Sequence, residues 1–166
     1  MTASADGRTE RFRRLHAPGQ LLLLPNAWDA GSARIIEACG ASAMATTSAG
    51  LAWVHGYPDG DLLPVRILAQ AVAEIARVVS VPLTVDVEGG YSTDPRIVGE
   101  TIAAVIDAGA VGINIEDGNA APELLCAKIE AAKTAAAGAG VDLFVNARTD
   151  VFLRGLVPPE QAVAVT

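Results

Sequence analysis

The sequence lacks the features that define several large classes of protein. It has only two cysteines, Cys39 and Cys126, and therefore neither a disulfide framework nor a zinc-binding motif. We expect both to be small, buried thiols in helices. It also lacks a basic stripe: the net charge is -7 and the lysines and arginines are dispersed. This argues against a nucleic-acid partner, because phosphate binding needs clustered positive charge.

Long hydrophobic runs are absent as well. No apolar run approaches the roughly 18 residues needed to span a bilayer, and residues 1–19 lack the apolar core of a secretory signal. We therefore expect a cytoplasmic protein without a membrane partner. We interpret residues 1–20 as a polar N-terminal leader and residues 21–166 as one domain, since a chain that is 51% hydrophobic can bury a substantial core.

Five short apolar runs predict β-strands, and each is followed by a segment with the apolar spacing of a helix. Strands followed by helices in regular alternation are typical of an α/β protein with a parallel sheet. The predicted strands are residues 21–24, 42–46, 82–87, 111–115 and 142–145, and the predicted helices are residues 30–39, 65–79, 95–108, 122–137 and one that opens at Pro158.

Polar residues inside three of these strands favour a closed barrel over an open doubly wound sheet. Apolar and polar residues alternate there, so the polar side chains of each strand share one face. Charges on a face covered by helices would be costly to bury, whereas in a barrel they converge on the mouth. A dinucleotide fold is further weakened by the missing G-x-G-x-x-G motif. We predict a (β/α)8 TIM barrel, of which this chain holds the N-terminal five βα units.

Carboxylates near the ends of two strands predict a divalent metal site. Asp86 and Glu88 share one strand face, and Glu116 projects from the next strand. Alone, the D-x-E triplet fits two solvated acids equally well, but three converging carboxylates call for a cation. Oxygen ligands favour Mg²⁺ or Mn²⁺ over zinc. Asp59 is a candidate for a contact through water, although it also fits a plain P-D-G turn.

Arg148 is the candidate for binding a substrate anion. It lies on the same face of the fifth strand as Asn146, and a guanidinium group can hold a carboxylate or phosphonate through two parallel hydrogen bonds. The alternative is a structural ion pair between Arg148 and Glu116.

The connection spanning residues 47–64 is longer than an ordinary βα loop, and such loops are often functional lids. Ser48, Gly50 and Leu51 offer a hydroxyl group and backbone N–H groups to an anion. His55 is a candidate acid or base, or alternatively an exposed loop histidine.

Taken together, these motifs resemble the isocitrate lyase / phosphoenolpyruvate mutase family. The resemblance covers residues 21–154 and runs through P-N-A-W-D-A-G-S-A, T-S-A-G-L-A, G-Y-P-D-G, D-V-E-G-G-Y, I-N-I-E-D and N-A-R-T-D. It implies that Asp86 binds magnesium directly, with Glu88, Glu116 and Asp59 in a water-mediated shell. It also implies that Arg148 and residues 48–51 hold the substrate anion.

The resemblance implies a magnesium-dependent lyase or mutase-like enzyme that acts on a small 2-oxo or 2-hydroxy acid through an enolate, making or breaking a C–C or P–C bond. We expect the full-length protein to be a homo-oligomer. The alternatives are a catalytically impaired, anion-binding derivative and a truncated fragment. Five βα units leave the barrel incomplete and a strand edge exposed.

One departure from the family concerns catalysis. After I-E-D, the lyases carry a K-K-C-G-H type loop with a catalytic cysteine, and mutase-like members keep a lysine there. This chain reads G-N-A-A-P over residues 118–122. We therefore expect that it does not cleave isocitrate or methylisocitrate, and the general acid or base stays unassigned.

Overall fold

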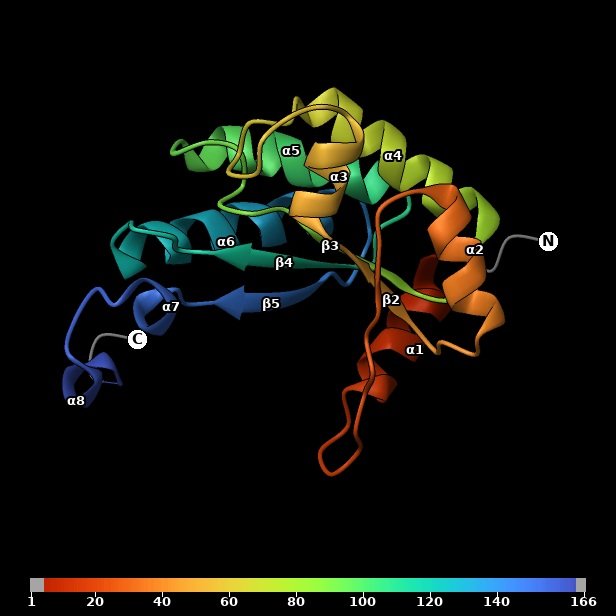
Figure 1. The fold of residues 1–166 in the computed structure, drawn as a ribbon, viewed down its shortest axis with the longest axis horizontal. Coiled ribbons are helices and arrows are strands. Elements are labelled where there is room, and N and C mark those ends of the chain that lie inside the picture. Colours follow the sequence, from red (N-terminus) through yellow and green to blue (C-terminus); the bar gives the residue numbers. More distant parts are fainter. Residues whose placement is uncertain (1–4, 164–166) are drawn as a thin grey trace.

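The computed structural model describes residues 5–163 and contains one parallel sheet of five strands in the order β1-β2-β3-β4-β5 (Figure 1). Consecutive parallel order is that of a βα barrel, whereas a doubly wound sheet reverses its order at a switch point. The sheet is therefore an arc of a barrel, with β1 and β5 at its edges, as predicted. The strands are β1 (Asn26–Ala27), β2 (Met44–Thr46), β3 (Leu83–Asp86), β4 (Gly112–Glu116) and β5 (Phe144–Arg148).

Four helices cover one face of the sheet: α2 (Ala30–Ala38), α4 (Val65–Val78), α5 (Pro95–Asp107) and α6 (Pro122–Gly138). The spacing of apolar residues explains their packing, as α4 illustrates. Its buried residues recur at i, i+3, i+4 and i+7, so they form one stripe against the sheet. They are Leu68, Ala71, Val72 and Ile75.

Local hydrogen bonds set where two of these helices begin. At α2, the Asp29 side chain accepts from the Ser32 N–H at 2.6 Å, and the Ser32 hydroxyl accepts from the Asp29 N–H at 3.1 Å. This reciprocal capping box satisfies N–H groups that have no partner within the helix. At α5, Asp94 accepts from the Arg96 N–H, and Pro95 supplies a preset first helical residue.

The strand alternation predicted from the sequence is present in β3 and β4. Val85, Ile113 and Ile115 are fully buried between the sheet and the helices. Thr84 and Asn114 lie on the other, concave face, where they line a cavity. The sheet therefore separates an apolar layer from a polar one.

A helix that the sequence did not predict, α1 (Ala5–Leu15), packs near the starts of the strands, on the side of the sheet away from α4, α5 and α6 (Figure 1). Phe12 is 1% exposed and clusters with Ala43 and Val111. Its ring meets that of Phe144 edge-on, with centroids 5.3 Å apart. A Cβ atom on Gly112 would lie 2.9 Å from the Phe12 ring, so only glycine lets the helix approach this closely. The leader interpreted from residues 1–20 thus includes a helix that belongs to the core.

Several local predictions were wrong. Residues 21–24 form no strand: Leu21 and Leu23 are 88% and 74% exposed, and β1 begins only at Asn26. Apolar character alone does not make a strand where no neighbouring strand pairs with it, and β1 pairs with β2 over only two residues. Both cysteines are exposed rather than buried.

Three short helices lie in the connections and were not predicted as such: α3 (Ser48–Val54), α7 (Val151–Arg154) and α8 (Pro159–Ala162). The first occupies part of the predicted lid loop, and the last is the start of the helix predicted at Pro158. No helix within residues 5–163 combines the length and the apolar character needed to cross a bilayer.

The burial of Phe12 predicts that α1 contributes to stability. In Phe12→Ala, the cavity left at the contact with Gly112 and Phe144 is expected to lower the free energy of unfolding by about 3–5 kcal/mol. Urea unfolding measures this. The matched control on the same helix is Arg14→Ala, because the Arg14 side chain is 71% exposed and its loss is expected to change stability by about 0.5 kcal/mol or less. Equal losses in the two variants would contradict the packing role of α1.

Candidate active site

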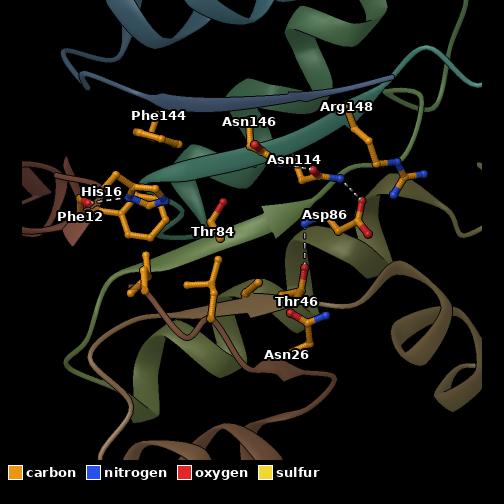
Figure 2. Close-up of a pocket in the computed structure, with 13 residues that line it drawn as sticks. Phe12, His16, Asn26, Thr46, Thr84, Asp86, Asn114, Phe144, Asn146 and Arg148 are labelled. Carbon is orange, nitrogen blue, oxygen red and sulfur yellow. Dashed lines mark hydrogen bonds between the residues drawn. The ribbon is translucent and has the colours of Figure 1, made fainter. Parts of the chain in front are cut away.

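A cavity of about 420 Å³ opens on the concave face of the sheet, and all five strands contribute to its lining (Figure 2). Its two ends differ in chemistry. Phe12, His16 and Phe144 lie at the end near the strand starts, whereas Asp86 and Arg148 lie at the end where the strands finish. In a βα barrel, the carboxyl ends of the strands are where catalytic groups gather. The polar end is therefore the candidate active site.

A row of hydrogen bonds crosses three strands at this end and positions Asp86. The parallel register places Asp86, Asn114 and Asn146 side by side. Asn146 Nδ2 donates to Asn114 Oδ1 at 2.6 Å, and Asn114 Nδ2 donates to Asp86 Oδ1 at 3.3 Å (Figure 2). The Asp86 N–H donates to Thr46 Oγ1 at 2.9 Å. The sequence reasoning assigned no role to Asn114 or Thr46, although the alternation in I-N-I-E did place Asn114 on this face.

Glu116 and Arg148 face each other in the register and form an ion pair. This is the structural pairing that we considered as the alternative role for Arg148. Only 13% of the Glu116 side chain is exposed. Burial raises the pKa of Glu116 to about 7; Arg148 opposes the shift, while Asp150, Asp86 and Glu88 add to it. The carboxylates that we expected to converge therefore repel one another here.

Asp150 positions the guanidinium group of Arg148, a role that was not predicted from the sequence. Its carboxylate is buried between two arginines: Oδ1 accepts from Arg148 Nε at 2.9 Å and Oδ2 accepts from Arg154 Nε at 3.0 Å. Burial alone would raise the pKa of Asp150, but the hydrogen bonds from Arg154 and Arg148 outweigh it and lower the pKa. The only sequence signal was the place of Asp150 two residues after Arg148 in N-A-R-T-D.

Glu88 does not continue the strand face of Asp86, which corrects the predicted geometry. β3 ends at Asp86, and Glu88 has a φ of +51°. The residue is 5% exposed, and its carboxylate accepts hydrogen bonds from the N–H groups of Gly60 and Asp61 and from the Tyr91 hydroxyl. Burial raises the pKa of Glu88, although the bonds from Asp61 and Tyr91 oppose the shift. Glu88 thus anchors the lid loop to the turn after β3.

The same anchor contains backbone strain. Within residues 5–163, Asp61, Glu88 and Tyr91 are the non-glycine residues with positive φ. Such a conformation costs on the order of 1–3 kcal/mol per residue and persists only where surrounding contacts impose it. Here the three residues bond to one another: besides the contacts of Glu88, the Tyr91 N–H donates to Asp61 Oδ1 at 2.9 Å. The anchor therefore holds the base of the lid loop in one arrangement.

The predicted residues of the lid loop lie outside this constellation. The N–H groups of Gly50 and Leu51 donate to the side chain and carbonyl oxygen of Thr47, at 3.2 and 3.0 Å, within α3. His55 and Asp59 are exposed. In the part of the chain that the structure describes, the cavity lining includes Asp86, Asn146 and Arg148 but not these four residues or Ser48.

The oxygen ligands present at the mouth fit a magnesium ion that keeps several of its water ligands. Among residues 5–163, no three acidic, histidine or cysteine side chains are grouped so as to hold a metal ion. Glu88 is committed to the loop anchor, which leaves Asp86 and Glu116 as oxygen donors at the mouth. Mg²⁺ usually binds one or two carboxylates together with waters and substrate oxygens, so this pair suits it better than zinc.

Comparison with known proteins identifies relatives over most of the chain. The phosphoenolpyruvate phosphomutase family matches residues 12–166. An uncharacterised protein of Mycobacterium tuberculosis is 39% identical over 148 residues, covering 85% of this chain and 53% of that protein. A 2-methylisocitrate lyase of Aeropyrum pernix is 31% identical over 165 residues, covering 92% and 51%. The chain therefore spans about half the length of the curated relatives it matches.

Solved structures share the fold, and two of them illustrate the likeness to this chain. A provisionally named phosphonomutase of Burkholderia cenocepacia has a TM-score of 0.89 at 43% identity, covering 96% of this chain and 67% of that one. A phosphonopyruvate hydrolase, solved with oxalate and Mg²⁺, has a TM-score of 0.85 at 25% identity, covering 95% and 57%. These likenesses confirm the predicted family and the partial TIM barrel. They do not support our exclusion of methylisocitrate cleavage, because 2-methylisocitrate lyases are among the relatives.

The raised pKa of Glu116 predicts a pH-dependent stability in metal-free protein. The folded state binds this proton more tightly than the unfolded state, whose carboxyl group has the ordinary pKa of 4.5. The resulting stabilisation is complete below pH 4.5 and is lost as the pH rises through about 7. The side chain of Glu116→Gln is uncharged at every pH and does not lose this stabilisation. The free energy of unfolding of the variant minus that of the wild type, measured by urea titration, should therefore rise between pH 4.5 and about 7.

A difference that stays constant with pH would show that Glu116 is not destabilised by burial. The matched control is Glu130→Gln, which alters an exposed carboxylate of α6, away from the arginine pair.

Proposed function

Since the chain belongs to the phosphoenolpyruvate phosphomutase family, we propose that it forms part of a magnesium-dependent lyase or mutase acting on a small 2-oxo or 2-hydroxy acid. The observation that carries the proposal is the juxtaposition of Asp86 and Arg148 at the carboxyl end of the sheet. A carboxylate for a cation and a guanidinium for an anion lie in one cavity. That pair suits a substrate whose carboxylate and oxo group must be held together.

In this proposal Arg148 binds the substrate carboxylate or phosphonate. Its Nε donates to Asp150, and its Nη2 pairs with Glu116 at the mouth. A substrate anion would take over part of that pairing. Asn146 and Asn114 orient Asp86 and offer amide groups to substrate oxygens. The residues thus bind and orient the substrate without rearrangement of the strands.

Asp86 would hold the magnesium ion directly, and Glu116, Glu88 and Asp59 would act through water. The ion would polarise the substrate oxo group and stabilise enolate charge. For Glu88 and Asp59, the proposal requires water to bridge from the loop anchor and from an exposed turn. Glu116, with its pKa near neutrality, is the residue at the mouth best suited to share a proton.

The lid residues remain part of the proposal. Ser48, Gly50 and Leu51 follow shortly after Thr46, which lines the cavity, so a small shift of α3 would bring them toward the substrate. The N–H groups of Gly50 and Leu51 would then donate to the substrate anion instead of to the oxygens of Thr47. His55, at the end of α3, would serve as an acid or base only after a larger closure of the loop.

A second candidate function is anion binding without catalysis. It is favoured by one observation: the turn of residues 118–121 reads G-N-A-A and carries no acid or base of its own. Because the chain spans about half the length of its curated relatives, the activity and oligomeric state of a complete barrel belong to the proposal too. Turnover by the full-length gene product distinguishes the two functions.

The proposal is tested by screening the full-length protein with Mg²⁺ against oxaloacetate, phosphonopyruvate, methylisocitrate and dimethylmalate. We expect turnover of at least one of them. With that substrate, Arg148→Lys is expected to lower kcat/KM on the order of 10²–10³-fold, because an ammonium group cannot replace the two parallel bonds of a guanidinium. Oxalate binding with Mg²⁺ but no turnover would favour the anion-binding function, and full activity of the lysine variant would refute the role of Arg148.

Metal binding is predicted to depend on Asp86. Asp86→Asn should abolish the calorimetric signal of Mg²⁺ binding, whereas Glu88→Gln and Glu116→Gln should only weaken it, because water separates these two residues from the ion. Asp107→Asn is the control, since this exposed residue ends α5 at the opposite end of the sheet from the mouth. Wild-type affinity in Asp86→Asn would show that the ion binds elsewhere.

A further inference from the structure

A second cavity of about 300 Å³ is lined by Glu116, the ion-pair partner of Arg148, which itself lines the first cavity. It lies beyond the ends of β3 and β4, and we call it the outer cavity. Its walls include the turn of residues 117–120, the Glu88 anchor, Lys128 of α6 and Arg154 of α7. None of the roles proposed above uses Arg154.

Most charged groups around the outer cavity already have partners. Glu88 accepts three hydrogen bonds, and Glu116 pairs with Arg148. Asp117 Oδ1 accepts from the Asp150 N–H at 2.8 Å. Lys128 is buried, and its Nζ donates to the carbonyl oxygen of Gly89 at 2.6 Å. These groups therefore already have partners within the protein.

Arg154 is different. Asp150 is the N-cap residue of α7 and Arg154 is its last residue. At this spacing of four residues the two side chains meet, and Asp150 Oδ2 accepts from Arg154 Nε at 3.0 Å. Arg154 Nη2 lies 3.9 Å from the position that a Cβ atom on Gly118 would occupy. Among residues 5–163, no side chain accepts from the two terminal nitrogens of Arg154. They line the outer cavity beside a turn that carries no cation.

We propose that Arg154 binds the distal anionic group of the substrate, while Arg148 binds the group nearest the oxo carbon. This inference rests on the proposed function and deepens it: the substrate carries an anion at both ends. Asp150 is the positioning residue for both arginines, because one buried carboxylate holds each of them through Nε. Their separation is therefore set by the protein before any ligand arrives.

The negative charge around the outer cavity makes the binding of a distal anionic group depend on Arg154. Its lining includes two cationic side chains and four carboxylates, so negative charge predominates and repels a second anion. The cations are Lys128 and Arg154, and the carboxylates are those of Asp61, Glu88, Glu116 and Asp117. A distal carboxylate is therefore bound there only if Arg154 offsets that repulsion with charge-assisted hydrogen bonds. Without Arg154, the same cavity would discriminate against substrates with two anionic ends and leave shorter ligands unaffected.

The test compares two probes by calorimetry on the full-length protein with saturating Mg²⁺. Oxalate occupies the inner site alone, whereas difluorooxaloacetate adds a distal carboxylate. In Arg154→Gln, we expect the Kd for difluorooxaloacetate to rise about ten- to a hundredfold, the usual effect of losing a hydrogen bond to a charged group. The Kd for oxalate should change less than twofold. Arg77→Gln, in the last turn of α4 at the opposite end of the sheet, controls for the loss of one positive charge.

Arg154→Lys keeps the positive charge but loses the Nε hydrogen bond to Asp150. We expect an intermediate rise in the Kd for difluorooxaloacetate and no change in the Kd for oxalate. This variant replaces Arg154→Gln as the test if the glutamine variant does not fold. Equal effects on both probes, or no effect on either, would overturn the role of Arg154 while the proposed function stands. A wild-type protein that binds neither probe with Mg²⁺ would overturn the proposed function, and this inference with it.

Discussion

The alternation of side chains along parallel strands is the constraint on which the rest of this molecule depends. In β3 and β4 it sends Val85, Ile113 and Ile115 into the apolar layer under the helices, and in β3, β4 and β5 it leaves polar groups on the concave face. Polar groups on a partly buried face need partners. The in-register neighbours supply them, since Asp86, Asn114 and Asn146 bond in a row across three strands. The candidate site is thus a direct product of sheet geometry.

Two buried carboxylates then do structural work around that site. Asp150 clamps the arginines behind the mouth, and Glu88 ties the lid loop to the turn after β3. In both cases a charge that would be costly to bury is offset by several donors at once. These two acids therefore fix the positions of the arginines and of the loop, while Asp86 and Glu116 lie at the mouth, where chemistry would occur.

The opposite end of the concave face is closed by apolar packing. Phe12 from α1 meets Phe144 of β5, and the His16 ring stacks on Phe144 with centroids 4.2 Å apart. The cavity is therefore apolar near the strand starts and polar at the strand ends (Figure 2). Arg148 and Asp86 both lie at the polar end.

How far the sequence determined this protein depends on the range of the interactions involved. Strand and helix positions in four of the five βα units, and the shared face of Asp86, Asn114, Glu116 and Arg148, followed from periodicity, which is a local property of the chain. The direction of Glu88 and the burial of Asp150 did not. Glu88 turns toward donors 27 and 28 residues away, and the Asp150 N–H donates to Asp117, which is 33 residues away. The helix around Phe12 acquires its role only from strands that lie far along the chain. Only the tertiary structure brings such partners together, because sequence spacing does not relate the Glu88 carboxylate to Gly60 and Asp61, or the Asp150 backbone to Asp117.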